Sequence, residues 1–244
     1  MTTEISLLDA LATTRSIRRY RPDPIPEADL NRMLWAATRA PQGSNRQGFR
    51  FLVLRDGPRA QAARRLIGDA AQSMWNAKRA IDRYDEGSGA AADTPKARMA
   101  ATMAHFVDHV HEAPVIVVAC LHLHHRPELS LGGAVYPAVQ NLLLAARAMG
   151  YGGCITGFYR SVEPELRRVL AIPENPDEVA IAAVITLGRP AGRHGPVRRR
   201  PIAELVYEDG WGEAPAWAQD PPGARFTSAG PPRRTRGQEP FPGE

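Results

Sequence analysis

Hydrophobic residues recur every three to four positions in two segments near the start of the chain, and this spacing predicts α-helices. The first helix is expected at residues 7–14. The second begins at Pro26, because proline followed by an acidic residue is typical of a first helical turn. Residues 15–24 form a basic connector between the two helices. The apolar positions of the second helix are Leu30, Met33, Leu34 and Ala37.

Short runs of β-branched or aromatic residues predict β-strands, because each run is bounded by charged residues, glycine or proline. These runs cover residues 49–54, 114–121 and 179–187. Together they indicate a mixed β-sheet. Residues 135–149 are apolar on almost all sides, which predicts a helix that is buried on most of its faces. Gly150 and Gly152 would end this helix.

The middle and the end of the chain differ from this regular arrangement. Residues 61–110 contain two alanine-rich helical patterns separated by a flexible turn at 86–90. We interpret 61–110 as a helical excursion or lid on a single domain that covers residues 1–211. The remaining residues, 212–244, are rich in proline and glycine and show little periodicity. This C-terminal tail is expected to be either disordered or draped over a partner subunit.

Length and composition indicate one soluble domain. The chain has 244 residues with no break in composition, and 43% of them are hydrophobic and 23% charged. No apolar run approaches the roughly 20 residues that span a bilayer. Residues 1–10 do not resemble a secretory signal, so the cytoplasm is the expected compartment. Cys120 and Cys154 lie in apolar surroundings, which predicts two buried thiols without a disulfide.

The formal net charge of +5 does not indicate a nucleic-acid-binding protein. The excess arginine is dispersed along helices apart from one cluster at 189–200, and no aromatic-interleaved basic stripe accompanies it. A small phosphorylated ligand needs fewer arginines and therefore fits the sequence better.

Two polar segments could bind such a ligand. Residues 15–20, Arg-Ser-Ile-Arg-Arg-Tyr, combine cations with a hydroxyl, the donor set that suits a phosphate, although a basic surface turn has the same composition. Residues 40–48 form a loop that leads from a helix into a strand. Within this loop, Asn45 and Gln47 each offer a donor and an acceptor that could recognise the edge of a heterocycle, although a simple polar turn would look the same.

Two later segments complete the candidate chemistry. Residues 150–158 are dense in glycine, which permits close approach of the backbone to a flat ligand. They are not a dinucleotide-binding fingerprint, because they follow a helix rather than a strand. Residues 196–206 place a group of arginines between two prolines, and this group could close over an anion.

These four segments, in this order, resemble the nitroreductase family over about residues 7–211. The family's opening R-S-x-R-x-[FY] matches residues 15–20, and its A-P-S-x-x-N-x-Q-P-W loop resembles residues 40–49. Residues 138–146 are similar to the family's central helix with its Q-N-L-x-L-A-A core. The glycine-dense segment and an R-x-P sequence at 199–201 complete the resemblance.

The resemblance implies an α+β fold, in which two protomers form an intertwined homodimer with FMN bound between them. The residues implied to hold the phosphate and ribityl chain are Arg15, Ser16, Arg18 and Arg199, with Arg198 as an alternative to Arg199. Asn45 and Gln47 would face the flavin, and the opposite protomer could supply Pro41, Gln42, Gly43 and Asn45. Ile155, Thr156 and Gly157 would lie along the ring near N5.

The implied activity is transfer of hydride from NADH or NADPH through flavin N5 to a flat, electron-poor acceptor, with ping-pong kinetics. Nitroaromatics, quinones and activated enones are acceptors of this kind. No side chain stands out as a catalytic acid or base. Trp75, Tyr84 and Phe106 could lie over the ring, although packing in the core is the simpler interpretation of these aromatics.

The sequence departs from the family pattern at two places. Gly48 and Phe49 replace the proline and tryptophan of the loop, and residues 154–156 read Cys-Ile-Thr where many relatives have proline or a carboxylate. Residues 61–110 match no family motif.

Other functions remain open at this stage. The protein could bind flavin as a sensor or carrier without turnover, or act as a flavin oxidase or dehydrogenase on a biosynthetic intermediate. Histidines spaced along a helix and a strand could instead hold a metal. They are His105, His109, His111, His122, His124 and His125.

Overall fold

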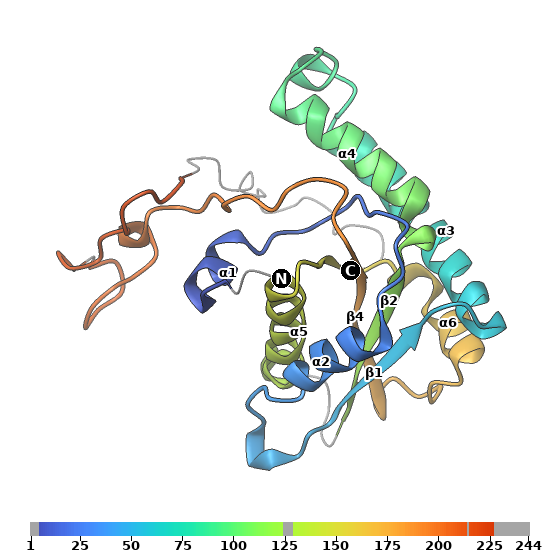
Figure 1. Ribbon diagram of the computed structural model, residues 1–244. Coiled ribbons are helices and arrows are strands. Elements are labelled where there is room, and N and C mark those ends of the chain that lie inside the picture. Colours follow the sequence, from blue (N-terminus) through green and yellow to red (C-terminus); the bar gives the residue numbers. More distant parts are fainter. Residues whose placement is uncertain (1–4, 124–128, 214, 227–244) are drawn as a thin grey trace.

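The computed structural model describes residues 5–123, 129–213 and 215–226, and a four-stranded β-sheet forms its centre (Figure 1). The strands are β1 (Phe49–Leu54), β2 (Val115–His122), β3 (Gly152–Thr156) and β4 (Val179–Gly188), in the order β1-β2-β4-β3. The strands expected at 49–54, 114–121 and 179–187 are therefore confirmed. β3 was not predicted as a strand, because its glycines suggested only a loop close to a ligand.

The expectation of a mixed sheet is corrected by the pairing: all three strand pairs among the described residues are antiparallel. The physical reason is visible between β1 and β2. The chain leaves the end of β1 and returns to the start of β2 at the same end of the sheet, since Leu54 pairs with Ile116. A connection that returns to the same end makes its two strands antiparallel.

Three helices lie on one side of the sheet, namely α1 (Leu7–Thr13), α2 (Glu27–Ala37) and α5 (Tyr136–Ala148). The apolar positions predicted for α2 and α5 pack there with the inward-facing residues of β2 and β4. Leu142 and Met33 are fully buried in this cluster. The periodicity of the sequence therefore identified both the helices and the faces that they bury.

The other face of the sheet is covered by α3 (Pro58–Ile81), α4 (Pro95–His109) and α6 (Glu163–Leu170). α3 and α4 form a hairpin whose far end projects beyond the sheet (Figure 1). Trp75 and Phe106 are buried in the core on this side, and Tyr84 packs against Trp75 with ring centroids 5.1 Å apart. Core packing, the simpler interpretation of these aromatics, therefore describes them.

The base of this hairpin is held by the guanidinium of Arg64, which is buried. It donates hydrogen bonds to the carbonyl oxygens of Leu54, His111, Ala113 and Pro114, at distances between 2.6 and 3.2 Å. Leu54 ends β1, and the other three acceptors lie where the chain comes back to β2. One side chain thus joins the two points at which the hairpin leaves and re-enters the sheet.

After β4 the chain continues as an arm, residues 189–226, that extends away from the sheet (Figure 1). Short 3-10 helices occur at Gly43–Asn45, Gly87–Gly89, Val110–Glu112, Leu129–Ala134, Arg160–Val162 and Ile202–Glu204. Cys120 and Cys154 are buried free thiols, as predicted. Among the described residues, no helix is both long and apolar enough to cross a bilayer.

Candidate functional site

The basic connector runs along the edge of the sheet beside β3. The backbone N–H of Ile17 donates to the carbonyl oxygen of Gly153 at 2.9 Å, and the Ile17 side chain is buried. Gly152 makes this approach possible, because a Cβ at that position would lie 2.5 Å from Cγ1 of Ile17. The glycine-dense segment therefore does permit close backbone approach, but the neighbour that it admits in this chain is the connector.

Tyr20 fixes the far end of the connector. Its hydroxyl donates to the carbonyl oxygen of Ile17 at 2.5 Å and lies 2.7 Å from Oγ1 of Thr186. Burial raises the pKa of Tyr20, and the hydrogen bond with Thr186 acts in the opposite direction. Backbone hydrogen bonds from Arg21 to Arg189 and from Ala191 to Arg19 then join the connector to the start of the arm.

Ser16 and Arg18 meet above the thiol of Cys154. Burial raises the pKa of Cys154, while the charge of Arg18 and hydrogen bonds from Ser16 and Arg18 oppose the rise. Nε of Arg18 is buried, yet it has no hydrogen-bond partner among the described residues. An unsatisfied buried donor on a cation is what a site for an external anion would contain.

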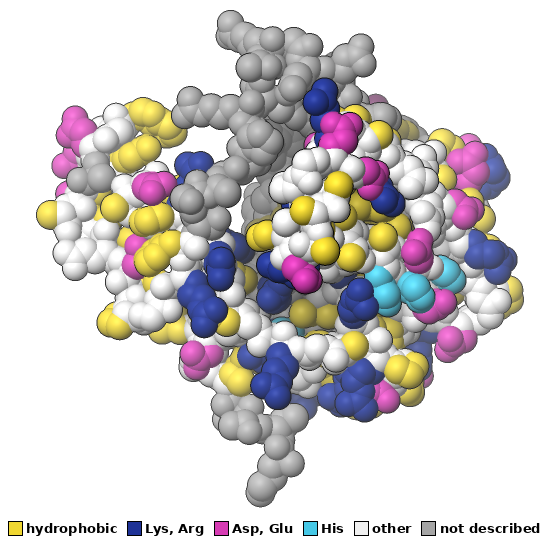
Figure 2. Space-filling model, turned by 90° about the horizontal axis from the view of Figure 1, so that it is seen from above, with side chains coloured by type: hydrophobic (Ala, Val, Ile, Leu, Met, Phe, Trp, Pro, Cys, Tyr) yellow, Lys and Arg dark blue, Asp and Glu magenta, His cyan; other side chains and the backbone are white. Residues whose placement is uncertain are grey.

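Arg15 is exposed at the other end of the connector, where the arm passes α1. The backbone N–H of Val197 donates to the carbonyl oxygen of Ala12 at 3.0 Å, which holds the arm there. No carboxylate among the described residues forms an ion pair with Arg15 or Arg18. Figure 2 looks down on this end of the molecule and shows basic side chains between the arm and the α3–α4 hairpin.

Arg199 lies further along the arm and is exposed. Its backbone N–H donates to the carbonyl oxygen of Arg225 at 3.2 Å, and its Nη1 donates to the carbonyl oxygen of Arg198 at 2.9 Å. Among the described residues, no hydrogen bond joins Arg199 to Arg15, Ser16 or Arg18. The choice between Arg198 and Arg199 as an anion ligand stays a prediction.

The end of β3 offers a surface of mixed polarity. Ile155 is 41% exposed, although it belongs to a strand that is otherwise largely buried. The Thr156 hydroxyl donates to the carbonyl oxygen of Val184 at 3.1 Å and is therefore already engaged. Gly157 lies beside the side chain of Arg160. An apolar side chain next to accessible backbone is a suitable floor for a flat ring.

The loop that carries Pro41, Gln42, Gly43, Asn45 and Gln47 is held at a different place. Nε2 of Gln42 donates to the carbonyl oxygen of Ala134 at 2.7 Å, and Nε2 of Gln47 donates to Oδ1 of Asn45 at 3.0 Å. Asn45 and Gln47 adopt left-handed backbone conformations, with φ of 52° and 50°.

Gly48 explains one departure from the family pattern. The N–H of His122 donates to the carbonyl oxygen of Gly48 at 2.8 Å, and a Cβ on Gly48 would lie only 2.8 Å from the carbonyl oxygen of His122. A larger residue would collide with backbone at this position. The loop is thereby fixed at the C-terminal end of β2.

Within one chain, the loop and the connector lie at opposite ends of the sheet. Leu121, near the end of β2, pairs with Phe49 after the loop, whereas Val115, at its start, pairs with Leu187 beside the connector. The eight residues of β2 extend over about 24 Å at 3.4 Å per residue. Figure 1 shows the light-blue loop between α2 and β1 far from the arm. One chain therefore does not bring all the predicted residues together.

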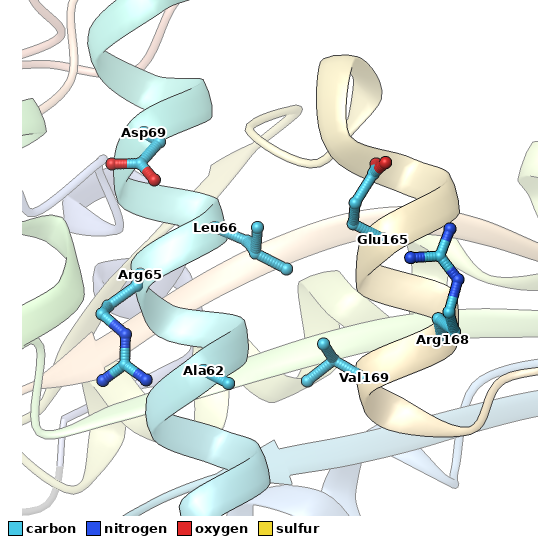
Figure 3. Close-up of a pocket in the computed structure, with 7 residues that line it drawn as sticks. All are labelled: Ala62, Arg65, Leu66, Asp69, Glu165, Arg168 and Val169. Carbon is cyan, nitrogen blue, oxygen red and sulfur yellow. The ribbon is translucent and has the colours of Figure 1, made fainter.

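Two grooves lie outside these segments. The first has a volume of about 510 Å³ and lies between α3 and α6, with a narrow apolar floor and charged side chains around it (Figure 3). It is lined by Ala62, Arg65, Leu66, Asp69, Glu165, Arg168 and Val169. The second, of about 420 Å³, lies between α1, α2 and α5 and is mainly apolar. Neither groove is lined by a predicted site residue.

The histidines do not form a metal site in the part of the chain that is described, where no group of three possible ligands comes together. The rings of His105 and His109 stack with centroids 4.2 Å apart. His124 and His125 lie outside the described residues.

Sequence reasoning did not identify three residues beside the connector. Tyr151, Arg147 and His194 lie close to it and to the base of the arm, as described below. The sequence contained no signal for Tyr151, which looked like part of a glycine-rich loop. His194 stood within the basic cluster at 189–200, but its proximity to Arg15 depends on the fold.

Comparison with known proteins identifies related sequences. A family model described as "Nitroreductase family" matches residues 11–189. The chain is 32% identical over 213 residues to an NADH dehydrogenase of Thermus thermophilus, an alignment that covers 84% of this chain and 98% of the relative. It is 31% identical over 209 residues to 5,6-dimethylbenzimidazole synthase of Rhodospirillum rubrum, with 81% and 86% covered.

Solved structures share the same fold. A nitroreductase-family protein of Desulfovibrio desulfuricans, solved in complex with FMN, superposes with a TM-score of 0.59 at 30% identity and covers 86% of this chain and 99% of its own. A BluB-like flavoprotein of Clostridium difficile superposes with a TM-score of 0.59 at 21% identity, with 84% and 99% covered. The second likeness concerns the fold alone.

Proposed function

Because the chain belongs to the nitroreductase family, we propose that it is an FMN-dependent oxidoreductase that takes hydride from NADH or NADPH and reduces a flat, electron-poor acceptor. The observation that carries this proposal is the connector, where two cations without a carboxylate partner in the described part of the chain lie next to an exposed apolar residue of β3. The FMN complex of the 30% identical relative supports the choice of flavin.

The donors of the connector fit a phosphate. Arg15 and Arg18 each present a guanidinium, whose N–H groups match the spacing of phosphate oxygens. Ser16 adds a neutral hydroxyl that can orient the ligand. The unpartnered Nε of Arg18 would gain an acceptor when the phosphate binds, which makes binding favourable beyond charge attraction alone. Arg199 would complete this set from the arm.

The end of β3 fits the ring. Ile155 offers apolar contact area, and the backbone of Thr156 and Gly157 is accessible beside it. When bound, FMN would supply the two-electron chemistry, by exchanging hydride at N5 with the nicotinamide and then with the acceptor. The chain contributes binding, orientation and exclusion of water, and none of the predicted site residues is a free acid or base.

We further propose that the site is completed by a second copy of the chain in a homodimer. Since the loop with Pro41, Gln42, Gly43, Asn45 and Gln47 and the connector of the same chain lie at opposite ends of β2, which is about 24 Å long, a second copy is needed to bring the two together. The groove between α1, α2 and α5 supports this proposal. Trp35 and Leu7, which line it, are 61% and 66% exposed and form an apolar surface suited to a subunit interface.

The acceptors that fit such a site are nitroaromatics, quinones and activated enones, which can stack on the ring. A second candidate function is a flavin oxidase or dehydrogenase acting on a biosynthetic intermediate. It is favoured by the 31% identity to a relative named 5,6-dimethylbenzimidazole synthase. In both functions the same residues bind the flavin.

An absorbance spectrum under argon tests the proposed function. The purified protein loaded with FMN should show the two flavin bands, and addition of NADH or NADPH should bleach them. Subsequent addition of a quinone should restore them. Flavin that binds but stays oxidised with both nucleotides would reject the reductase and favour the biosynthetic oxidase or a carrier. Failure to bind FMN at all would reject the proposal as a whole.

A further inference from the structure

His194 lies where the base of the arm meets α1, α5 and the connector. Its Nε2 lies 3.0 Å from the carbonyl oxygen of Tyr151. A carbonyl oxygen can only accept, so the proton of the neutral imidazole is on Nε2. Nδ1 is therefore the unprotonated nitrogen. It is buried and has no hydrogen-bond partner among the described residues.

Tyr151 provides a rigid support for this histidine. It is fully buried, and its hydroxyl donates to Oδ2 of Asp29 at 2.6 Å. Nη2 of Arg189 donates to the same hydroxyl at 3.1 Å, with the guanidinium 4.4 Å from the ring centroid. The carbonyl that holds His194 thus belongs to a residue anchored to both α2 and the start of the arm.

Among the described residues, the charged groups that act on His194 are two arginines. Arg147 acts from α5 and Arg15 from the connector, while the backbone carbonyl of Thr13 faces it from α1 as a hydrogen-bond acceptor. Nε of Arg147 donates to Oγ1 of Thr13 at 2.9 Å, so Arg147 is held in place. A Cβ on Gly195 would lie 3.8 Å from Nη1 of Arg15, which shows how closely the arm passes this arginine.

We propose that His194 is a further ligand of the flavin phosphate, and that it takes up a proton from solvent when the phosphate binds beside Arg15. This inference rests on the proposed function, because it concerns the anion site of FMN. It explains why a buried imidazole nitrogen without a partner lies among two arginines and no carboxylate. An anion is the missing member of this arrangement.

The charges around His194 determine that FMN binding takes up a proton rather than releasing one. Without ligand, burial is the main cause that lowers the pKa of His194, and the charges of Arg147 and Arg15 lower it further. A phosphate dianion reverses the local field and raises the pKa, so the imidazolium forms in the complex. FMN affinity should therefore increase as the pH falls through the raised pKa of His194 in the complex towards its lowered pKa in the free protein. The phosphate itself gains a proton near pH 6, and its charge then decreases.

Calorimetric titration of the full-length protein with FMN at pH 7.5 tests the proposal. Titrations in phosphate-free buffers with different ionisation enthalpies give the number of protons taken up per FMN. We expect net uptake in the wild type, loss of that uptake in His194→Gln, and about tenfold weaker FMN binding or more in the variant. Glutamine retains an N–H for the carbonyl of Tyr151. His111→Gln, an exposed histidine at the end of the hairpin, is the matched control and should behave like the wild type.

Riboflavin, which lacks the phosphate, should bind without the uptake. Equal proton uptake in the wild type and in His194→Gln would overturn the inference while leaving the proposed function intact. Failure of the wild type to bind FMN would reject the proposed function instead. If the variant does not fold, the histidine resonances of the wild type provide the test. One histidine pKa should rise on addition of FMN, and unchanged histidine pKa values would contradict the proposal.

Discussion

The hydroxyl of Tyr20 lies 2.7 Å from Oγ1 of Thr186, and this contact joins the basic connector to the last residues of β4. Thr186 is fully buried, so the hydrogen bond forms away from water. The same hydroxyl donates to the carbonyl oxygen of Ile17. Ser16 and Arg18 are therefore the two neighbours of an anchored residue. The connector is thus organised before any ligand arrives, and the entropic cost of ordering it is met by folding rather than by binding.

Removal of this hydroxyl should weaken both the fold and the site. Tyr20→Phe loses two hydrogen bonds and leaves Thr186 without its partner, which should lower the free energy of unfolding by about 1 to 3 kcal/mol. Urea denaturation measures the loss, and Tyr207→Phe in the arm is the matched control. A Tyr20→Phe protein as stable as the wild type would show that the connector is held by its backbone alone.

Gly152→Ala should displace the connector. The new Cβ would lie 2.5 Å from Cγ1 of Ile17, so we expect a loss of about 1 to 3 kcal/mol from overpacking. Ile17→Ala shortens that side chain, and the double variant should therefore lose less stability than the sum of the two single variants. Gly43→Ala, where a Cβ meets nothing within 4 Å, is the control. If the stability loss of the double variant equals the sum of the losses of the two single variants, the two residues are not coupled.

The arginines of the connector should determine how firmly FMN is retained. Arg18→Ala removes the donor that lacks a protein partner, and we expect FMN binding to weaken by about 1 to 3 kcal/mol. Fluorescence titration of the apoprotein with FMN measures the change. Arg21→Ala changes an arginine that pairs with Asp23 and should leave the affinity unaltered. Equal affinity in the Arg18→Ala protein and the wild type would remove Arg18 from the phosphate site.

A charge in the groove between α1, α2 and α5 should have two effects at once: dissociation of the subunits and loss of FMN binding. Trp35→Glu places a carboxylate in the proposed interface, so the protein should elute as a monomer in light-scattering chromatography and no longer bind FMN. Ile81→Glu changes a residue that is 57% exposed at the end of α3 and should leave the assembly unchanged. Tight FMN binding by a monomer would refute the shared site.

The stability of the protein should decrease in alkaline solution because of Tyr151. Burial and the hydrogen bond to Asp29 raise the pKa of Tyr151 to about 12. The unfolded state releases this proton near pH 10, so the tyrosine's contribution to folding is complete below pH 10 and is lost as the pH rises towards about 12. Between these pH values, the free energy of unfolding should fall more steeply with pH for the wild type than for Tyr151→Phe, as measured by denaturation curves. Parallel curves would contradict the assignment.

Much of the fold follows from short-range patterns. Apolar spacing identified α2 and α5, and β-branched runs identified three of the four strands. β3 was missed because its first two residues are glycines, which have low strand propensity. A Cβ on Gly152 would collide with the Ile17 side chain, and a Cβ on Gly153 would collide with the carbonyl oxygen of Thr186. The antiparallel pairing was missed because it depends on where the hairpin returns, and no local pattern records that.

The sequence motifs predict candidate site residues but not how the fold arranges them. Arg15, Ser16 and Arg18 are adjacent in sequence, so a motif could identify them. The separation of Gln42 from Arg15 depends on the length and direction of β2, which only the assembled sheet shows. His194 and Arg147 could not be found from the sequence, because they are 47 residues apart and meet through the contacts of Tyr151 and Thr13.

The hydrogen bonds that Arg64 donates at the base of the α3–α4 hairpin affect how this protein can change over evolutionary time. Its hydrogen bonds join the end of β1 to the chain that returns to β2, so they hold these two strand ends together across the base of the α3–α4 hairpin. Insertions and deletions at the largely exposed tip of the hairpin, residues 82–94, can therefore accumulate without loss of these hydrogen bonds, whereas Trp75 and Phe106 are constrained by the core that they share with β3.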